Sequence, residues 1–373
     1  MDRLENTLRT VREGAGLSQA QLAAAAGISR QAYAAIERGR ATPSTEISLR
    51  LARTLRTSVD SLFRLPDAAP GLRATLTDPI PKDSATPIRA DVHQVGDRWI
   101  ARPLTGSVQR PAIHRTLPVA NAVIRPLPDG NEAEVELLDG GSLKTLVAVG
   151  CDPSMAVVAA HLQERGVRLI SHEMGSTSAL QELARGNAHI AGCHLLDAET
   201  GQYNLPWVRR YLPFPATVVT FAVWDQGLIV APGNPKQIRR IADLARPDVR
   251  IVNREAGSGS RGLLEETLAA DGLNQEQVVG FDHEARSHLS VAEAVGSGLV
   301  DTGVAVRAAA IALGLDFVPL GQERYDLVIP QHFIDSTLVQ ELLDSLRHAA
   351  LRRQIEALVG YDVALMGSQP AAA

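Results

Sequence analysis

Residues 18–44 decide the fold of the N-terminal part of the chain, and they read SQAQLAAAAGISRQAYAAIERGRATPS. Ser18 is a good N-cap for a short helix, in which Leu22 and its alanine neighbours form a narrow apolar stripe. Gly27 stands where a tight turn needs a residue that tolerates positive φ, and Ser29 follows as the N-cap of a second helix. The stretch therefore predicts two short helices joined through a glycine.

This arrangement is typical of the helix-turn-helix, whose second helix lies in the major groove of DNA. The GIS turn and the IERGRATPS segment that follows the second helix resemble the XRE (Cro/C1) family, and the resemblance covers residues 3–63. It implies that this part binds double-stranded operator DNA. We expect Arg30 and Gln31 to read bases, and Gln19 with Arg38 or Arg40 to contact phosphates. The complete predicted set of DNA contacts is Gln19, Ser29, Arg30, Gln31, Tyr33, Arg38 and Arg40.

The distribution of charge agrees with a DNA-binding N-terminal part. The formal net charge of the 373-residue chain is −5, but residues 1–65 carry ten arginines against six acidic residues, a balance of +4 that leaves −9 on the remainder. A basic unit on an acidic body fits a sequence-specific DNA binder. The length predicts two or three domains.

Cysteine content and hydropathy predict the cellular setting. Two cysteines cannot form a disulfide framework, which favours a reducing compartment. No apolar run reaches the roughly 18–20 residues of a membrane span, and no secretory signal precedes the first helices. We therefore expect a cytoplasmic protein.

The chain divides into three predicted segments: a five-helix domain over 1–65, a connector over 66–142 and a sensor domain over 143–373. The later helices of the first segment are expected at 44–56 and 58–63. The connector begins with helix-breaking prolines, namely Pro66, Pro70, Pro79, Pro81 and Pro87. Alternating apolar and polar residues then predict short strands at 92–95, 98–101, 120–124 and 132–138. The connector is either a small β subdomain or an extension of the next domain, and we assign it no chemistry.

From Leu143 the pattern changes to alternating strands and helices. Strands are predicted at 146–150, 167–171, 189–192, 218–223, 228–230, 249–252 and 300–306, and helices at 153–165, 177–185 and 260–271. Elements of these lengths in alternation indicate a parallel sheet with right-handed crossovers. Residues 325–330 are expected to return the chain across a hinge between two lobes.

The segments NREAGSGSRGLL (253–264), AEAVGSGLVDTGVA (292–305) and YDLVIP (325–330) resemble the type II periplasmic-binding-protein fold over about 143–350. They are similar to the binding domain of intracellular regulators related to molybdate- and tungstate-binding proteins. The predicted fold class is therefore an all-α helix-turn-helix domain, a short strand-rich connector and a two-lobed α/β domain.

Three turns rich in Ser and Thr follow strands of this domain: 152–154, 175–178 and 257–260. Ligands of open α/β sheets lie beyond the carboxyl ends of strands, where helix N-termini offer N–H groups and a positive dipole end. Plain helix capping is the alternative for any single turn. We predict an anion site that comprises Asp152, Ser154, Ser176, Thr177, Ser178, Asn253, Arg254, Ser258, Gly259, Ser260, Arg261 and Thr302.

The resemblance implies a molybdate- or tungstate-type oxyanion as the ligand. Tetrahedral-oxyanion binders of this fold mostly use neutral donors, so an arginine that points inward, Arg254 or Arg261, would favour an organic acid or a phosphorylated metabolite. The glycine-rich turn lacks the Gly-Lys-Ser/Thr ending of a P-loop, which argues against nucleotide hydrolysis.

The two cysteines allow a different interpretation. If the first lobe has strand order 2-1-3, Cys151 and Cys193 end adjacent strands, with His194 and His172 nearby. Such a group is either a redox pair or soft-metal site, or two small buried residues with two exposed histidines.

These observations predict a one-component transcription regulator that binds operator DNA as a homodimer on an inverted repeat and responds to a small anion. No cofactor is expected besides that effector. We expect no enzymatic activity, since no Ser-His-Asp, His-Glu-x-x-His or paired-carboxylate pattern is present. A binding module whose helical domain contacts protein is a further alternative, against which Arg30 and Gln31 argue.

Overall fold

The computed structural model describes residues 4–64, 72–80, 88–104, 120–127, 131–138 and 144–369. It divides into two compact units, Met1–Leu72 and Arg73–Ala373, which are described separately. The predicted breaks at Pro66, Pro70, Pro81 and Pro87 lie outside the described residues.

The first unit contains the five predicted helices. They are α1 (Leu8–Gly14), α2 (Gln19–Ala26), α3 (Arg30–Glu37), α4 (Thr45–Leu55) and α5 (Val59–Leu62), and the short strands β1 (Glu5–Asn6) and β2 (Phe63–Arg64) pair antiparallel. Ser18 and Gln21 form a capping box at the start of α2. Gly27 has φ 74°, and a Cβ at this position would lie 2.6 Å from Nη1 of Arg50. The turn between α2 and α3 therefore requires glycine for both conformation and space.

The strand-rich segment forms a closed barrel in the second unit. Its strands follow the order β3-β5-β4-β6-β7, with bounds β3 (Leu72–Leu76), β4 (Ile88–Val95), β5 (Arg98–Pro103), β6 (Ala122–Pro126) and β7 (Glu132–Leu137). Val95 and Ile100 share a buried cluster with Leu180 of the α/β part. Nη2 of Arg102 also donates to Oε2 of Glu182 over 2.8 Å in a buried ion pair. The barrel thus packs on the α/β part, as the extension that was one of the two expectations.

One sheet of seven strands organises the α/β part. Its order is β14-β11-β15-β10-β8-β9, and β16 pairs with β11. The strands are β8 (Thr145–Gly150), β9 (Arg168–Glu173), β10 (Ile190–Cys193), β11 (Ala216–Val230), β14 (Thr302–Val306), β15 (Asp316–Pro330) and β16 (Tyr361–Asp362). A separate parallel pair joins β12 (Asn253–Arg254) to β13 (Glu284–Ala285). The helices are α6 (Met155–Glu164), α7 (Ser176–Ala184), α8 (Leu205–Tyr211), α9 (Gly259–Ala270), α10 (His288–Gly296), α11 (Arg307–Ala312), α12 (Thr337–Ser345) and α13 (Ala349–Glu356).

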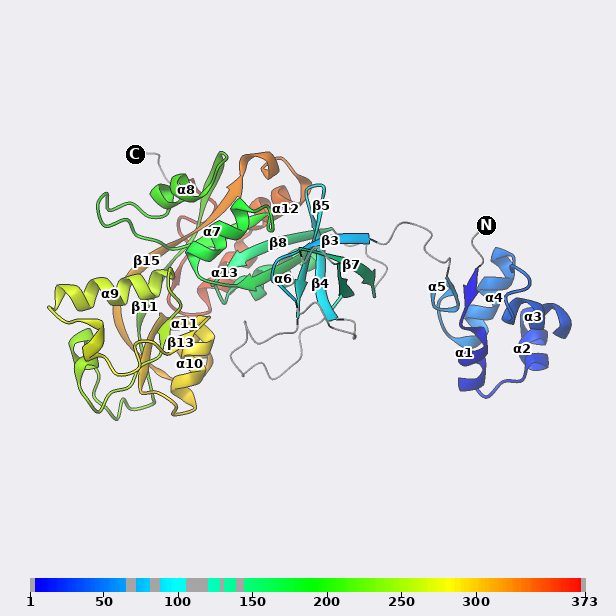
Figure 1. Ribbon diagram of the computed structural model, residues 1–373, viewed down its shortest axis with the longest axis horizontal. Helices are drawn as coiled ribbons and strands as arrows, with labels where there is room; N and C mark the ends of the chain where they lie inside the picture. Colours follow the sequence, from blue (N-terminus) through cyan, green and yellow to red (C-terminus); the bar gives the residue numbers. More distant parts are fainter. Residues whose placement is uncertain are drawn as a thin grey trace. The chain divides into compact units, whose positions relative to one another are not determined.

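Two strands of 15 residues each, β11 and β15, run antiparallel to one another and connect two lobes. The first lobe has β9-β8-β10 with α6 and α7, which is the order 2-1-3 under which Cys151 and Cys193 would end adjacent strands. The second lobe contains β12 to β14 with α9 and α10. Figure 1 shows α9 and α10 in yellow at one end of this unit, with β11 and β15 leading from them toward α7 and α8 in green.

Two predicted strand assignments were wrong. The strands expected at 218–223 and 228–230 are parts of the single strand β11, because residues 224–227 continue its pairing with β15, with a register shift between Gln226 and Gly227. Residues 249–252 are not a strand of the sheet; Ile251 makes only an isolated bridge to Thr302. Among the described residues, no helix has the length and apolar character that a membrane crossing requires.

Candidate functional site: a DNA-facing helix and a buried site between two lobes

Helix α3 presents the side chains expected to read DNA. Arg30 and Gln31 are exposed on its first turn, after the Ser29 N-cap, whose Oγ accepts from the N–H of Ala32 over 3.1 Å. Arg38 and Arg40, which follow the helix, are exposed as well. These placements suit base readout by the helix N-terminus and phosphate contacts from its other end.

Two other predicted DNA contacts have structural partners instead. Tyr33 is fully buried, and its hydroxyl donates to Glu37 over 3.0 Å. The side-chain amide of Gln19 also donates to Glu37, which accepts a third bond of 2.7 Å from Nε of Arg12. The buried position of Tyr33 disagrees with a role at the DNA surface. Burial raises the pKa of Glu37, but the bonds from Arg12, Gln19 and Tyr33 outweigh it and lower that pKa overall.

The lobes of the second unit meet where the predicted turns face each other. The backbone N–H and Oγ1 of Thr177, at the start of α7, both donate to the carbonyl of Gly257 in the other lobe, over 3.2 and 2.8 Å. A Cβ at Gly175 would lie 2.9 Å from Oε1 of Glu255 and 3.3 Å from Ser258. The second and third predicted turns are therefore in contact, and the residues between the lobes are enclosed.

A chain of polar side chains lies between the lobes. Sγ of Cys151 lies 3.2 Å from Nε2 of His194, and Nδ1 of the same ring lies 2.7 Å from Oε2 of Glu323. The amide of Gln226 donates to Glu323 and to Oγ of Ser260, both over 3.0 Å. Burial lowers the pKa of His194, yet the Cys151 sulfur and the Glu323 carboxylate raise it, with a net value of about 10.

Arg254 adds a positive charge to this buried group. Its side chain is fully buried, and Nε and Nη2 bind the Glu255 carboxylate over 2.9 and 3.1 Å, besides the carbonyls of Ala285 and Arg286. Nη1 has no hydrogen-bond partner among the described residues. Burial lowers the pKa of Arg254, but the Glu255 carboxylate and the Cys151 sulfur raise it overall, so the guanidinium remains charged.

Asp152 and Ser154 follow Cys151 and are buried. Oδ1 of Asp152 accepts from the N–H of Ser154 and from the hydroxyl of Tyr361, both over 2.7 Å. Burial raises the pKa of Asp152 to about 6. Oγ of Ser154 has no hydrogen-bond partner in the described part of the chain.

Some of the remaining predicted residues of the first lobe and the third turn have partners within the protein. Oγ of Ser176 accepts a hydrogen bond from the N–H of His194 over 3.1 Å, and Ser178 is half-buried on α7. Gly259 packs against His194, and a Cβ at Gly259 would lie 2.3 Å from the histidine carbonyl oxygen. Oγ of Ser258 accepts from the N–H of Arg261 over 3.3 Å. Ser258 therefore caps α9.

Three further predicted residues lie around Arg254 or at the other end of β14. Arg261 binds Glu265 and Glu284 over 2.9 and 3.0 Å, and its Nη1 also donates to the backbone carbonyl of Arg254 over 3.4 Å. Oδ1 of Asn253 accepts from the N–H of Arg254, and its amide donates to the carbonyl of Phe281. Thr302 begins β14 opposite Val230, whereas the other end of β14, Val306, lies opposite Gln226. The register thus places Thr302 at the end of the strand remote from Gln226.

The cysteine group is different from the one expected. Cys193 is buried with its sulfur 3.9 Å from the carbonyl of Ser176, and His172 lies with Asp91 and His93 of the barrel. The residues that converge with Cys151 are His194 and His288, whose possible ligand atoms all lie within 4.8 Å of one another.

Sequence reasoning missed His288, Glu323 and Gln226. His288 begins α10 directly after the N-cap Ser287, so it occupies the type of helix N-terminus that had pointed to Ser154 and Ser176. Glu323 and Gln226 lie on the hinge strands β15 and β11, where no local pattern distinguishes a polar site residue from a strand residue facing solvent.

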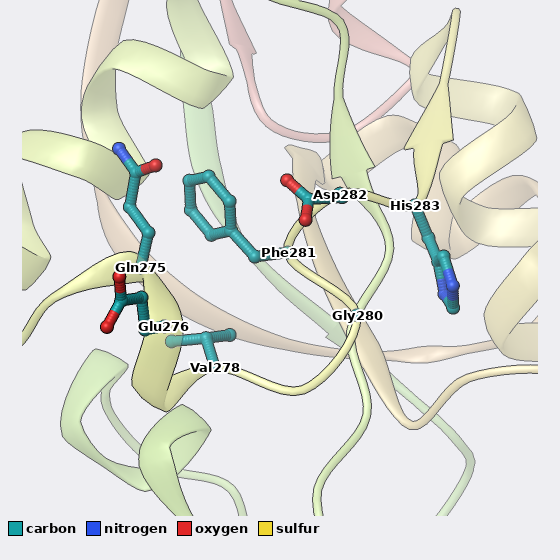
Figure 2. Close-up of a pocket in the computed structure, with 7 residues that line it drawn as sticks. All are labelled: Gln275, Glu276, Val278, Gly280, Phe281, Asp282 and His283. Atoms are coloured by element: carbon teal, nitrogen blue, oxygen red, sulfur yellow. The ribbon is translucent and has the colours of Figure 1, made fainter.

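A separate surface hollow lies on the second lobe (Figure 2). Its volume is about 310 Å3, and its lining comprises Gln275, Glu276, Val278, Gly280, Phe281, Asp282 and His283. None of the predicted site residues lines it. Its two carboxylates do not suit an anionic ligand.

Comparison with known proteins identifies both units. Residues 8–62 match the helix-turn-helix family and residues 159–347 match the PBP superfamily domain. The uncharacterized protein YvgK of Bacillus subtilis is 37% identical over 223 residues, which are 58% of this chain and 71% of that protein. An uncharacterized protein from the 5′ region of the 2Fe-2S ferredoxin gene of Clostridium pasteurianum is 30% identical over 106 residues, 28% of this chain and 94% of its own length.

Solved structures of binding proteins are similar at lower identity. A putative phosphate ABC transporter substrate-binding protein from Clostridium perfringens, with bound phosphate, has 14% identity and TM-score 0.45, and covers 57% of this chain and 97% of its own. The tungstate ABC transporter from Geobacter sulfurreducens has 12% identity and TM-score 0.44, with 57% and 98% covered. Likeness at this level assigns no ligand. Because its sequence matches these families, the chain belongs to the PBP superfamily and carries an XRE-type helix-turn-helix domain at its N-terminal end.

Proposed function

We propose that this protein is a transcription regulator whose DNA affinity responds to a small anion held between the two lobes of its α/β domain. The helix-turn-helix supplies an exposed recognition helix, and the lobes enclose a group of buried polar residues. The proposal is carried by one observation: Nη1 of the buried Arg254 has no hydrogen-bond partner among the described residues. A buried, unpaired N–H of a charged group is costly unless a ligand accepts from it.

The chemistry of Arg254 favours a carboxylate or phosphate group on the ligand over molybdate or tungstate. Guanidinium groups donate strong, charge-assisted hydrogen bonds to carboxylates and phosphates. Glu255 already occupies Nε and Nη2, so Nη1 remains for a ligand. Oγ of Ser154 is a second free donor. The effector we propose is therefore a small organic acid or phosphorylated metabolite.

Regulation would follow from closure of the lobes. A ligand that contacts Ser154 of the first lobe and Arg254 of the second is bound more tightly by the closed form than by the open one, and shifts the population accordingly. In a homodimer on an inverted repeat, that shift would change the spacing of two α3 helices. Light scattering of the free protein and of its operator complex tests the dimer, and a monomer with one-to-one stoichiometry contradicts it.

The effector is tested by isothermal titration and thermal shift on the full chain with small carboxylates, phosphorylated acids, phosphate, sulfate, molybdate and tungstate. We expect Ser154→Ala and Arg254→Met each to weaken binding at least about tenfold, since a hydrogen bond to a charged group contributes about 1.5–3 kcal/mol. Arg246→Met is the control, because Arg246 pairs with Asp248 and belongs to no part of the proposed site. Molybdate or tungstate binding in preference to all organic acids contradicts the ligand class. The absence of any anion that shifts the melting temperature contradicts the sensor function.

A further inference from the structure

Cys151, His194 and His288 form a constellation that the anion site does not explain. One ligand atom of each, a sulfur and two ring nitrogens, lies within 4.8 Å of the others, and all three side chains are buried. The contact between Sγ of Cys151 and Nε2 of His194 is 3.2 Å. Ligands at tetrahedral Zn–S and Zn–N bond lengths stand about 3.5 Å apart, so small side-chain shifts bring this group to coordinating geometry.

The orientation of His194 is that of a metal-ligating histidine. Its Nδ1 lies 2.7 Å from Oε2 of Glu323, and Gln226 donates to the same carboxylate oxygen. Histidines that bind metals commonly donate their other ring N–H to a carboxylate, which fixes the tautomer and directs the free nitrogen to the ion. Here that arrangement directs Nε2 of His194 toward Cys151.

His288 provides an independent observation. Its side chain is fully buried, and neither ring nitrogen has a hydrogen-bond partner among the described residues. The Trp224 ring packs against it in an edge-to-face arrangement with centroids 5.5 Å apart. A fully buried imidazole whose ring nitrogens lack partners in the described part of the chain, and which reaches to within 4.8 Å of the Cys151 sulfur, has the placement of a metal ligand.

We propose that Cys151, His194 and His288 bind a borderline-soft divalent cation, with Zn2+ as the expected ion. A thiolate and two imidazoles suit zinc, and three protein ligands leave a fourth position open. Binding deprotonates the Cys151–His194 pair, and the proton that these residues share passes to solvent. Cys151 and His194 end strands of the first lobe whereas His288 begins a helix of the second, so the ion binds fully only when the lobes close.

The open position also gives the anion a second anchor. Nε and Nη2 of Arg254 donate to the carbonyls of Ala285 and Arg286, both over 3.2 Å, which holds the guanidinium against the segment that leads into His288. An anion that binds Nη1 of Arg254 can therefore complete the coordination of the ion. This part of the inference rests on the proposed function; the metal site itself does not.

The test uses the full chain after chelation and dialysis. We expect Zn2+ titration to show one high-affinity site that releases protons, measured as a dependence of the heat on the buffer. Co2+ should give the near-ultraviolet absorption of a thiolate-bound ion. Cys151→Ser should abolish that absorption, and Glu323→Gln should weaken zinc binding about 10–100-fold through the loss of the carboxylate partner. Because Glu323→Gln is nearly isosteric, it remains informative if His288→Ala does not fold.

Two variants serve as matched controls. Cys193→Ala removes the other buried cysteine, and His172→Ala disrupts the second group of possible metal ligands, Asp91, His93 and His172. Both should leave zinc affinity and cobalt absorption unchanged. Zinc affinity that is unchanged in Cys151→Ser and Glu323→Gln, or that is lost in His172→Ala, overturns the proposed site.

Anion titration with and without Zn2+ separates the two proposals. Zinc binding without any anion binding in either form retains the metal site and overturns the proposed effector. Anion binding that depends on Arg254 but has equal affinity with and without Zn2+ retains the proposed function and overturns the shared coordination.

Discussion

Oγ1 of Thr177 donates a hydrogen bond of 2.8 Å to the carbonyl oxygen of Gly257, and this bond joins the first lobe to the second. We expect Thr177→Val to favour the open form and to weaken effector binding by about 2- to 10-fold, since one neutral hydrogen bond contributes about 0.5–1.5 kcal/mol. Thr267→Val is the matched control, because that hydroxyl bonds the carbonyl of Leu263 within α9. Equal affinities of Thr177→Val and the unmodified protein, measured by isothermal titration, contradict a role in closure.

The recognition helix is tested by comparing operator and random DNA. Gln31→Ala should relax the preference at one base pair by about 1–3 kcal/mol, whereas Arg40→Ala should weaken binding to all sequences and reduce the salt dependence. Fluorescence anisotropy at several salt concentrations measures both. If Gln31→Ala weakens binding to operator and random DNA equally, Gln31 does not read a base.

Glu37 is predicted to stabilise the N-terminal unit, because its carboxylate accepts hydrogen bonds from three buried or half-buried side chains. Glu37→Gln breaks the ion pair with Arg12 and should reduce the free energy of unfolding by roughly 3 kcal/mol at pH 7. Because folding lowers the pKa of Glu37, its contribution is present above the ordinary value of 4.5 and is lost as pH falls below that value. The pH dependence of unfolding between about pH 3 and 7 should therefore be weaker in Glu37→Gln.

Calorimetry of the full chain measures this effect in the transition of the N-terminal unit. The control is Glu46→Gln, whose pairing with Arg50 is exposed and should contribute less than about 1 kcal/mol. If the unfolding curves of Glu37→Gln and Glu46→Gln coincide, the buried pair contributes no more to stability than the exposed one.

Asp152 is predicted to reduce the stability of the free protein at neutral pH. Its pKa is raised to about 6 by burial, so the folded state favours the protonated acid, and stability is lost as pH rises from about 4 through 6. Asp152→Asn keeps the acceptor Oδ1 for Ser154 and Tyr361 and should raise stability by about 1–3 kcal/mol at pH 8, with a smaller gain at pH 4.5. Melting temperatures at the two pH values check this, with the exposed Asp344→Asn as the control. A gain of the same size at both values contradicts the assignment.

Local patterns predicted the elements well where one feature dominated. Capping serines and Gly27 defined α2 and α3, and apolar runs defined β8, β9 and β10. Two strands were predicted at 218–223 and 228–230, whereas residues 224–227 lie within the single strand β11, which pairs with β15 along its length.

The candidate site was predictable only in part, because strand ends identify positions and not partners. The ends of β8 and β10 correctly brought Cys151 near His194. Their partner His288 is remote in sequence, and no spacing pattern relates the three. Tyr33 was placed at the DNA surface because its position on the first turn of α3 does not reveal that it packs into the core.

The strand order of the large sheet has a consequence for synthesis of the protein on the ribosome. β10 and β11 are neighbours in sequence, but β15 (Asp316–Pro330) lies between them in the sheet and pairs with both. Residues 367 and 368 then bond the backbone of Thr220 in β11. The sheet therefore cannot be completed until the last sixth of the chain has been synthesised. The N-terminal unit, with its local contacts, can fold as soon as it leaves the ribosome. A nascent or prematurely terminated chain would therefore carry the complete DNA-binding unit before the part that we propose to control it has folded.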